Sequence, residues 1–152
     1  RLTRGEPIMQ LIEMLKKHEG VETHAYVDTV GKTTIGVGRN IDAADGLGLS
    51  EKEIDYLLHN DIDRVENELL KSLPWVSNLN PDRFDALVDI CFNLGLPRFL
   101  KFQKALNALM THNYELAAIE FLDSRWAKQV GGRAIELAEM IRTGVYQEDY
   151  KV

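Results

Sequence analysis

Apolar side chains recur along most of this chain at the spacing of a helix face, and one short segment near the start breaks that pattern. Between residues 6 and 18 one apolar helix face is predicted, made of Ile8, Leu11, Ile12 and Leu15. Gly20 follows where this helix should end, because glycine readily adopts the left-handed conformation that closes helices. The next segment, AYVDTVGKTTIGVGR at residues 25–39, is rich in β-branched residues and glycine, which predicts a hairpin or a small sheet.

A second helix is predicted from Ser50 to about Ser72, after a loop at residues 40–50. Ser50 and Glu53 have the spacing of a capping box, in which each side chain accepts a hydrogen bond from the other residue's backbone N–H. At 1.5 Å per residue this helix is about 33 Å long, which is long for so small a protein. Such a helix is suited to connecting two lobes.

The remainder of the chain predicts further helices. After a turn between Pro74 and Pro81, two apolar stripes have helical spacing: Phe84, Leu87, Val88 and Cys91, then Phe102, Leu106, Leu109 and Met110. The pairs Ile119 with Leu122 and Ala138 with Ile141 continue the pattern. One small β-containing region within a mostly helical chain predicts the α+β class.

Composition and charge narrow the range of functions. The chain has 152 residues, 45% of them hydrophobic, which suffices for one domain with its own core. No apolar run approaches the roughly 18 residues that span a bilayer, and the N-terminal RLTRGEPIMQ lacks the apolar stretch that is typical of a secretion signal. The formal charge is −6 without a basic tract, which argues against nucleic acid as a partner. Cys91 is the single cysteine, so the chain can form no internal disulfide, and a lone cysteine of this kind is expected in the core. The histidines do not have the spacing of metal ligands.

Candidate chemistry lies where the first helix meets the strands. Glu19 stands at the expected helix end, and Asp28 follows nine positions later at a predicted turn. Cleavage of a glycosidic bond uses such a pair, one group to protonate the leaving oxygen and one to activate water or support charge. A threonine hydroxyl, from Thr33 or Thr34, can orient that water. The alternative is that these are solvated charges at a helix end and a turn.

The complete string HEG, YVDTVG and TTIGVGR resembles the catalytic segment of the T-even phage type of lysozyme, family 24 of the glycoside hydrolases. The family motif E-G-x7-D-x5-T-I-G-x-G matches residues 19–38 without a gap. The resemblance implies that Glu19 is the general acid, that Asp28 positions or activates water, and that Thr34 is the third catalytic residue. Thr33 would then point to the opposite face.

The likeness continues through RFDALVDICFNLG, FLDSRWAKQVGGRA and IRTGVY, and covers most of the chain from Leu11 to Tyr150. It implies a lysozyme-like two-lobed α+β fold within a single domain of residues 1–152. The small β-containing lobe would cover about residues 19–60. The larger helical lobe would combine residues 1–18 with about 61–152, and the long helix would join the two.

The resemblance also implies a substrate and further site residues. The expected reaction is hydrolysis, with inversion, of the β-1,4 bond between N-acetylmuramic acid and N-acetylglucosamine in bacterial peptidoglycan, without metal or cofactor. Phe92, Asn93 and Arg133 match substrate-binding positions, and Arg133 matches an arginine that pairs with the catalytic glutamate. Because arginine favours an ionised carboxylate while a general acid must be protonated, we expect desolvation by bound glycan to offset Arg133.

Other positions carry structural expectations or depart from the family. The resemblance implies that Trp126 packs in the core and that Arg39 pairs with Asp61. Three residues that contact ligand in the best-known member are replaced here, by Asn40, Ala105 and Glu120. The negative net charge of this chain is a further departure from that member.

The expected setting is phage lysis by a monomeric endolysin without stable membrane association. It would be held in the host cytoplasm and act on the wall in the periplasm. The alternatives are a virion tail-associated lysozyme domain, a glycan-binding module without turnover, and a helical adaptor for a protein partner. Retention of the acid, the second carboxylate and the threonine argues against a module that only binds, and an adaptor would leave the β segment unexplained.

Overall fold

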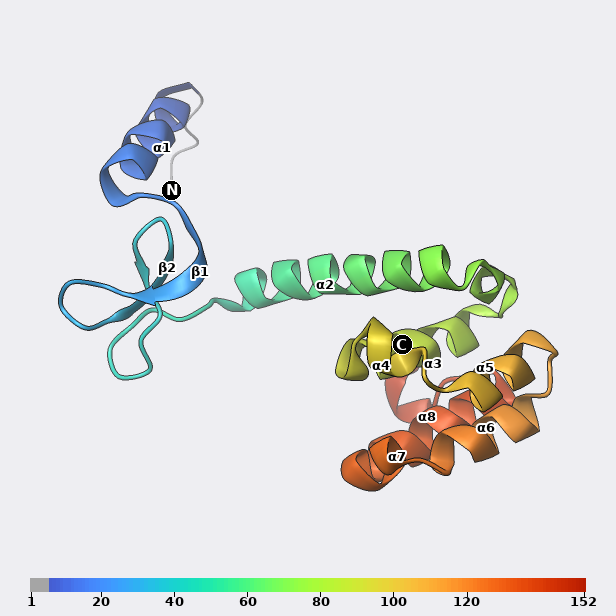
Figure 1. Ribbon diagram of the computed structural model, residues 1–152. Coiled ribbons are helices and arrows are strands. Elements are labelled where there is room, and N and C mark those ends of the chain that lie inside the picture. The colour runs from blue at the N-terminus through green and yellow to red at the C-terminus, as the bar shows by residue number, and fades with distance from the viewer. Residues whose placement is uncertain (1–5) are drawn as a thin grey trace. The chain divides into compact units, whose positions relative to one another are not determined.

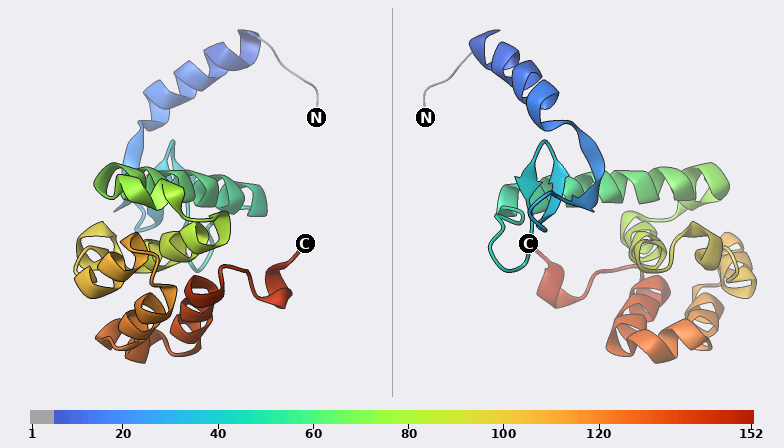
Figure 2. Two further views of the ribbon diagram at one scale, coloured as in Figure 1. Left: turned by 90° about the vertical axis from the view of Figure 1, so that its right-hand side faces the viewer. Right: turned by 60° about the vertical axis from the view of Figure 1, so that its left-hand side comes forward.

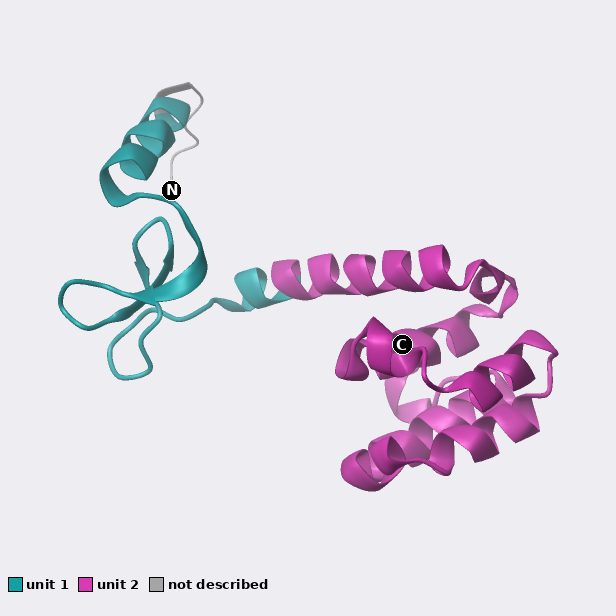
Figure 3. Cartoon of the chain, viewed as in Figure 1, with its two compact units in different colours: residues 1–55 teal, residues 56–152 magenta. Residues whose placement is uncertain are grey.

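The computed structural model describes residues 6–152. This part of the chain forms two compact units, one that ends at Asp55 and one that covers residues 56–152 (Figure 3). The first unit begins with helix α1 (Glu6–Glu19), as the apolar spacing predicts. The helix ends at Gly20, which has a φ of 79°, and the Gly20 N–H donates to the Lys16 carbonyl at 2.9 Å. The expected glycine stop is therefore present.

A three-stranded antiparallel sheet follows α1, in the order β1 (Glu22–Val27), β2 (Thr33–Gly36) and β3 (Arg39–Asn40) (Figure 1). Tyr26 pairs with Thr34 across β1 and β2, and Thr34 pairs with Asn40 across β2 and β3. The hairpin was expected from its β-branched residues. The third strand fits the alternative expectation of a small sheet, although β3 extends to Asn40, which the pattern assigned to the following loop.

Helix α2 (Glu51–Ser72) begins in the first unit and continues into the second. Its capping box is present: the Ser50 N–H donates to Glu53 Oε1 at 2.9 Å, and the Glu53 N–H donates to Ser50 Oγ at 3.2 Å. Glu53 also forms an ion pair with Arg39, with 2.7 Å between Arg39 Nη2 and Glu53 Oε2. The expected partner of Arg39 was Asp61, and Asp61 instead pairs with Arg64 at 3.3 Å. Glu53 takes this role because the capping box holds it beside the loop that leaves β3.

The second unit is built of helices. They are η1 (Pro74–Asn78), α3 (Pro81–Leu94), α4 (Leu96–Phe99), α5 (Gln103–Met110), α6 (Tyr114–Leu122), α7 (Arg125–Val130), α8 (Gly132–Thr143) and η2 (Glu148–Tyr150). Helix α6 packs against both α5 and α8, and α3 packs against α4 and α8; the views of Figure 2 show the same grouping. The segment between Pro74 and Pro81, predicted as a turn, contains the short η1.

The buried hydrophobic residues of the described chain lie in this second unit, and nearly all of them form one cluster. Its fully buried large members are Phe99, Phe121, Leu69, Leu87, Ile90, Leu109, Ile141, Val76 and Cys91. Cys91 is 1% exposed and is therefore a core residue, as expected; this burial raises the pKa of its thiol to about 11. Trp126 is 4% exposed and packs edge-on against Phe102, which confirms its expected place in the core.

The α+β class is confirmed: a small sheet near the N-terminus is followed by a helical C-terminal part. The single-domain assignment and the expected lobes, which place residues 1–18 with the helical lobe, stay predictions. Residues 1–5 lie outside the described part of the chain.

Candidate active site

Asp28 is held by the turn that joins β1 to β2. Its Oδ1 accepts hydrogen bonds from the backbone N–H of Val30 at 3.0 Å and of Lys32 at 2.8 Å. The Asp28 N–H donates to the Lys32 carbonyl at 2.9 Å, and the Gly31 N–H donates to the Asp28 carbonyl at 3.0 Å. Aspartate forms such turns because its short side chain reaches the N–H groups just ahead of it. Oδ2 accepts no hydrogen bond from the described residues, so one carboxylate oxygen stays available for a ligand.

Thr34 lies in β2 and is only 3% exposed, the one buried polar residue of the described chain. Its hydroxyl donates to the Lys32 carbonyl at 2.9 Å, which leaves its oxygen free to accept a further hydrogen bond. Thr33, its neighbour, is partly exposed, and its N–H donates to Asp42 Oδ2 at 3.2 Å. Successive strand residues face opposite sides, so the two threonines do not share a face.

Glu19 is the last residue of α1, and its carboxylate lies against the turn between β2 and β3. A Cβ atom placed on Gly38 would be 2.7 Å from Glu19 Oε2 and 3.2 Å from Cδ. Gly38 has a φ of 66°, a conformation that itself favours glycine. The last glycine of the T-I-G-x-G string thus makes room for the carboxylate at the helix end.

Charged side chains of the loop after β3 surround the Asp28 turn. Lys32 Nζ lies 3.0 Å from Asp45 Oδ2, and this hydrogen-bonded contact raises the pKa of the Lys32 ammonium. The backbone N–H groups of Thr33 and Ala44 donate to Asp42 and lower the pKa of its carboxyl. The polar network therefore continues from the turn into the loop at residues 41–48.

A groove of about 500 Å³ lies in the second unit. Its lining residues are Leu58, Ile62, Glu66, Asp85, Val88, Asp89, Phe92, Arg133 and Tyr146. Arg133 donates to Asp89 from Nε at 2.8 Å and lies within 2.7 Å of it through Nη2. The Tyr146 hydroxyl donates to Asp85 Oδ2 at 2.6 Å, and burial together with this bond raises its pKa. The groove combines an apolar wall with acidic groups and one guanidinium.

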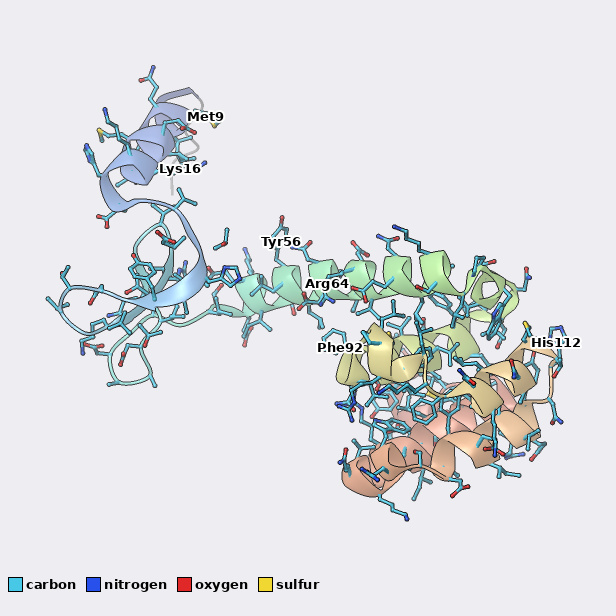
Figure 4. All side chains as sticks on the ribbon, viewed as in Figure 1. Met9, Lys16, Tyr56, Arg64, Phe92 and His112 are labelled. Atoms are coloured by element: carbon cyan, nitrogen blue, oxygen red, sulfur yellow. The ribbon has the colours of Figure 1, made fainter. Side chains whose placement is uncertain are left out.

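Two predicted substrate-binding residues lie on α3. Phe92 is 43% exposed and lines the groove, and its side chain can be found on α3 in Figure 4. Asn93 Oδ1 accepts a hydrogen bond from the indole N–H of Trp126 at 2.8 Å. The side-chain oxygen of Asn93 therefore has a structural partner, while its Nδ2 remains as a donor.

The structure groups the predicted site residues by unit. Glu19, Asp28 and Thr34 belong to the first unit, whereas Phe92, Asn93 and Arg133 belong to the second. Within residues 6–152 no cluster of histidine, cysteine, aspartate or glutamate has the arrangement of a metal site. No helix of that range is long and apolar enough to cross a membrane.

Sequence reasoning missed several residues of this site. Lys32, Asp42 and Asp45 were assigned no role, and Asp89 was not expected as the partner of Arg133. The string Asn-Ile-Asp at residues 40–42 carries a local signal, since asparagine and aspartate form turns with the backbone two residues ahead. The Lys32–Asp45 and Arg133–Asp89 pairs have no such signal, because their partners are brought together only by the fold.

The chain thus combines an α+β fold with a carboxylate at a helix end, a second carboxylate in a hairpin turn and a buried threonine hydroxyl. The phage lysozyme family model matches residues 16–142, a range that contains all six predicted site residues. The chain belongs to the phage lysozyme family. Its class is accordingly that of the peptidoglycan-lytic lysozymes.

Individual relatives agree with this assignment. The chain is 28% identical to the probable T4-type lysozyme 2 of Dictyostelium discoideum, over 93% of this chain and 98% of that protein. It is 36% identical to the endolysin of Salmonella phage P22, over 73% of this chain and 77% of that protein. It is also 28% identical to the pre-baseplate central spike protein of Enterobacteria phage T4, over 93% of this chain but only 29% of that longer protein.

Proposed function

We propose that this lysozyme hydrolyses the β-1,4 bond between N-acetylmuramic acid and N-acetylglucosamine of bacterial peptidoglycan, with inversion at the anomeric carbon. One observation carries the proposal. Glu19, Asp28 and Thr34 are presented by a helix end, a hairpin turn and a strand of one compact unit. Asp28 and Thr34 each form a hydrogen bond with the Lys32 backbone, and the Glu19 carboxylate lies close to Gly38. These are the groups that acid–base cleavage of a glycosidic bond requires.

The three residues divide the reaction between them. Glu19 donates a proton to the leaving glycosidic oxygen as the carbon–oxygen bond breaks. A water molecule attacks the anomeric carbon and passes its proton to Asp28, whose Oδ2 is free of hydrogen bonds within the described chain. The Thr34 hydroxyl, which gives its own proton to the Lys32 carbonyl, accepts a hydrogen bond from this water and orients it.

The groove of the second unit supplies the substrate contacts in this proposal. Phe92, which lines the groove, offers an apolar face to a sugar ring. Asn93, its neighbour on α3, is not among the groove's lining residues; its amide N–H group would donate to a sugar oxygen. Arg133 lines the same groove, where it forms an ion pair with Asp89.

The biological setting that we infer is lysis of a phage host by a monomeric enzyme. It would be held in the host cytoplasm and act on the wall in the periplasm, without a cofactor or stable membrane association. The relatives named endolysin support this setting. The similarity to a central spike protein supports a second candidate, a lysozyme domain carried by a virion. Mass spectrometry of purified virions separates the two, since only the second candidate predicts the chain within the particle.

The decisive experiment measures turbidity loss of permeabilised Gram-negative cells. Glu19→Gln keeps the shape of the side chain but removes the proton source, and Asp28→Asn removes the base. Since proton transfer contributes roughly 100- to 10,000-fold, losses of this size are expected for both. Glu13→Gln, an exposed change on the same helix, is the matched control and should lyse cells as the wild type does. Full lysis by Glu19→Gln would refute the mechanism.

Product stereochemistry tests inversion separately. Proton NMR of the freshly released reducing end should show the α-anomer before mutarotation, because single displacement by water inverts the β-linkage. A β-anomer as the first product would require a covalent or substrate-assisted route instead.

A further inference from the structure

The backbone of Lys32 connects two of the three proposed catalytic residues. Its N–H donates to Asp28 Oδ1 at 2.8 Å. Its carbonyl oxygen accepts from the Asp28 N–H at 2.9 Å and from Thr34 Oγ1 at 2.9 Å. Any movement of Lys32 therefore moves the carboxylate and the hydroxyl together.

The side chain of Lys32 is anchored outside the turn. Its ammonium lies 3.0 Å from Asp45 Oδ2, in the loop at residues 41–48. That loop is itself tied to β2, because Asp42 accepts a hydrogen bond from the N–H of Thr33 at 3.2 Å. Within the loop, Asp42 also accepts a hydrogen bond from the N–H of Ala44 at 3.2 Å. The carboxyl groups that act on the ammonium are those of Asp45, Asp42 and Asp28. The Lys32 side chain thus adds a direct link between the turn and the loop, beside the contact of Asp42 with the Thr33 backbone.

We propose that Lys32 is a positioning residue for the hydrolysis: its bridge to Asp45 holds the turn in the geometry in which Asp28 presents Oδ2 to the attacking water. This inference rests on the proposed function, and it adds residues that the family motif leaves as variable positions. Lys32 does not touch the reacting atoms, and it acts through its backbone bonds to Asp28 and Thr34.

The bridge affects rate more than stability for a physical reason. The side chains of Lys32 and Asp45 are 34% and 55% exposed, and ion pairs in such positions contribute little to folding. A displacement of about 1 Å at a reacting group can nevertheless cost roughly 100-fold in rate. A small shift of the turn should therefore lower kcat while the folded state persists.

The test compares Lys32→Met, Asp45→Asn and the double variant by steady-state hydrolysis of soluble peptidoglycan fragments. We expect each single variant to lose about tenfold in kcat with unchanged KM, and the double variant to lose no more than the worse single one. Lys32→Arg, which can still reach Asp45, should recover most of the rate. Lys16→Met is the matched control: Lys16 forms an exposed pair with Glu13 on α1, at 3.7 Å, and is labelled in Figure 4.

Three results would overturn the inference: wild-type kcat in both single variants, a rise in KM alone, or independent losses that multiply in the double variant. A rise in KM alone would mean that the lysine binds an anionic group of the substrate. Thermal unfolding is recorded for each variant, and if Lys32→Met does not fold, Asp45→Asn decides because it keeps the lysine. Wild type and Glu19→Gln are assayed beside them. If wild type is inactive, or if Glu19→Gln matches it, the proposed function itself fails.

Discussion

The hairpin region of the first unit and the helical second unit are stabilised by different interactions. Around Asp28 the backbone is held by side-chain carboxylates that accept N–H groups, as at Lys32 and Thr33. In the second unit a cluster of apolar side chains, including Phe99 and Leu87, is fully buried. This difference predicts whether a substitution in each region should change mainly activity or mainly stability. Changes in the polar network should reduce activity with little loss of stability, and changes in the apolar cluster should reduce stability first.

The largest expected effect is on stability, and two phenylalanines of the second unit test it. Phe99 is fully buried beside Phe121, with ring centroids 6.4 Å apart, whereas Phe92 is 43% exposed. Phe99→Ala should lower the free energy of unfolding by about 3–5 kcal/mol, because it removes buried contacts and leaves a cavity. Phe92→Ala should cost about 0.5 kcal/mol and instead weaken binding of glycan fragments.

Urea unfolding followed by circular dichroism gives both free energies, and calorimetric titration with glycan fragments gives the affinity. Equal destabilisation by the two substitutions would contradict the division between a core position and a substrate-facing position.

A smaller effect, on activity, is expected from the glycines of the T-I-G-x-G string. Gly38 and Gly36 have similar φ values, 66° and 71°, so alanine at either position should cost about 1–2 kcal/mol of backbone strain. Only at Gly38 would the added Cβ meet the Glu19 carboxylate, at 2.7 Å; at Gly36 nothing lies within 4 Å. Gly38→Ala should therefore lose roughly 10- to 100-fold in kcat beyond the loss in Gly36→Ala.

Both variants are compared at a temperature where each is fully folded, by the turbidity assay and by thermal unfolding. Equal activity of the two would mean that Gly38 serves only the turn and that Glu19 adapts to a Cβ at no catalytic cost.

Local sequence patterns predicted the parts of the fold that depend on neighbouring residues. Gly20 ends α1 and the Ser50–Glu53 capping box begins α2, because each involves atoms a few residues apart. The segment with Asp28 was identified as a turn for the same reason. The alternation between Thr33 and Thr34 also follows from strand geometry, and Thr34 is the buried one.

Pairs that the fold brings together could not be predicted in this way. Arg39 was expected with Asp61 on the basis of a family position, yet its partner is Glu53, fourteen residues away. The spacing of Lys32 and Asp45 in the sequence does not distinguish this pair from the other charged residues of the chain. Long side chains offer several partners within reach, and only the backbone path of the loop selects one.

The smallest effect concerns acid sensitivity of the polar network, and Asp42 is the residue that tests it. Hydrogen bonds from the Thr33 and Ala44 backbones lower its pKa from the usual 3.8, so its carboxylate favours the folded state above that value. This contribution is lost as pH falls below about 4 through the folded pKa. Asp42→Asn should therefore unfold at a lower temperature than wild type at pH 6, with the gap narrowing towards pH 3.

Thermal unfolding of wild type and Asp42→Asn at several pH values between about 3 and 6 measures this gap. Asp63→Asn, an exposed change on α2, is the control and should leave the pH dependence of unfolding close to that of wild type. Amide proton shifts of Thr33 and Ala44 should move with the same titration, since their N–H groups lose an ionised acceptor. A gap that stays constant down to pH 3 would show that the N–H contacts to Asp42 do not depend on its charge, and the contrast between the two units would then rest on packing alone.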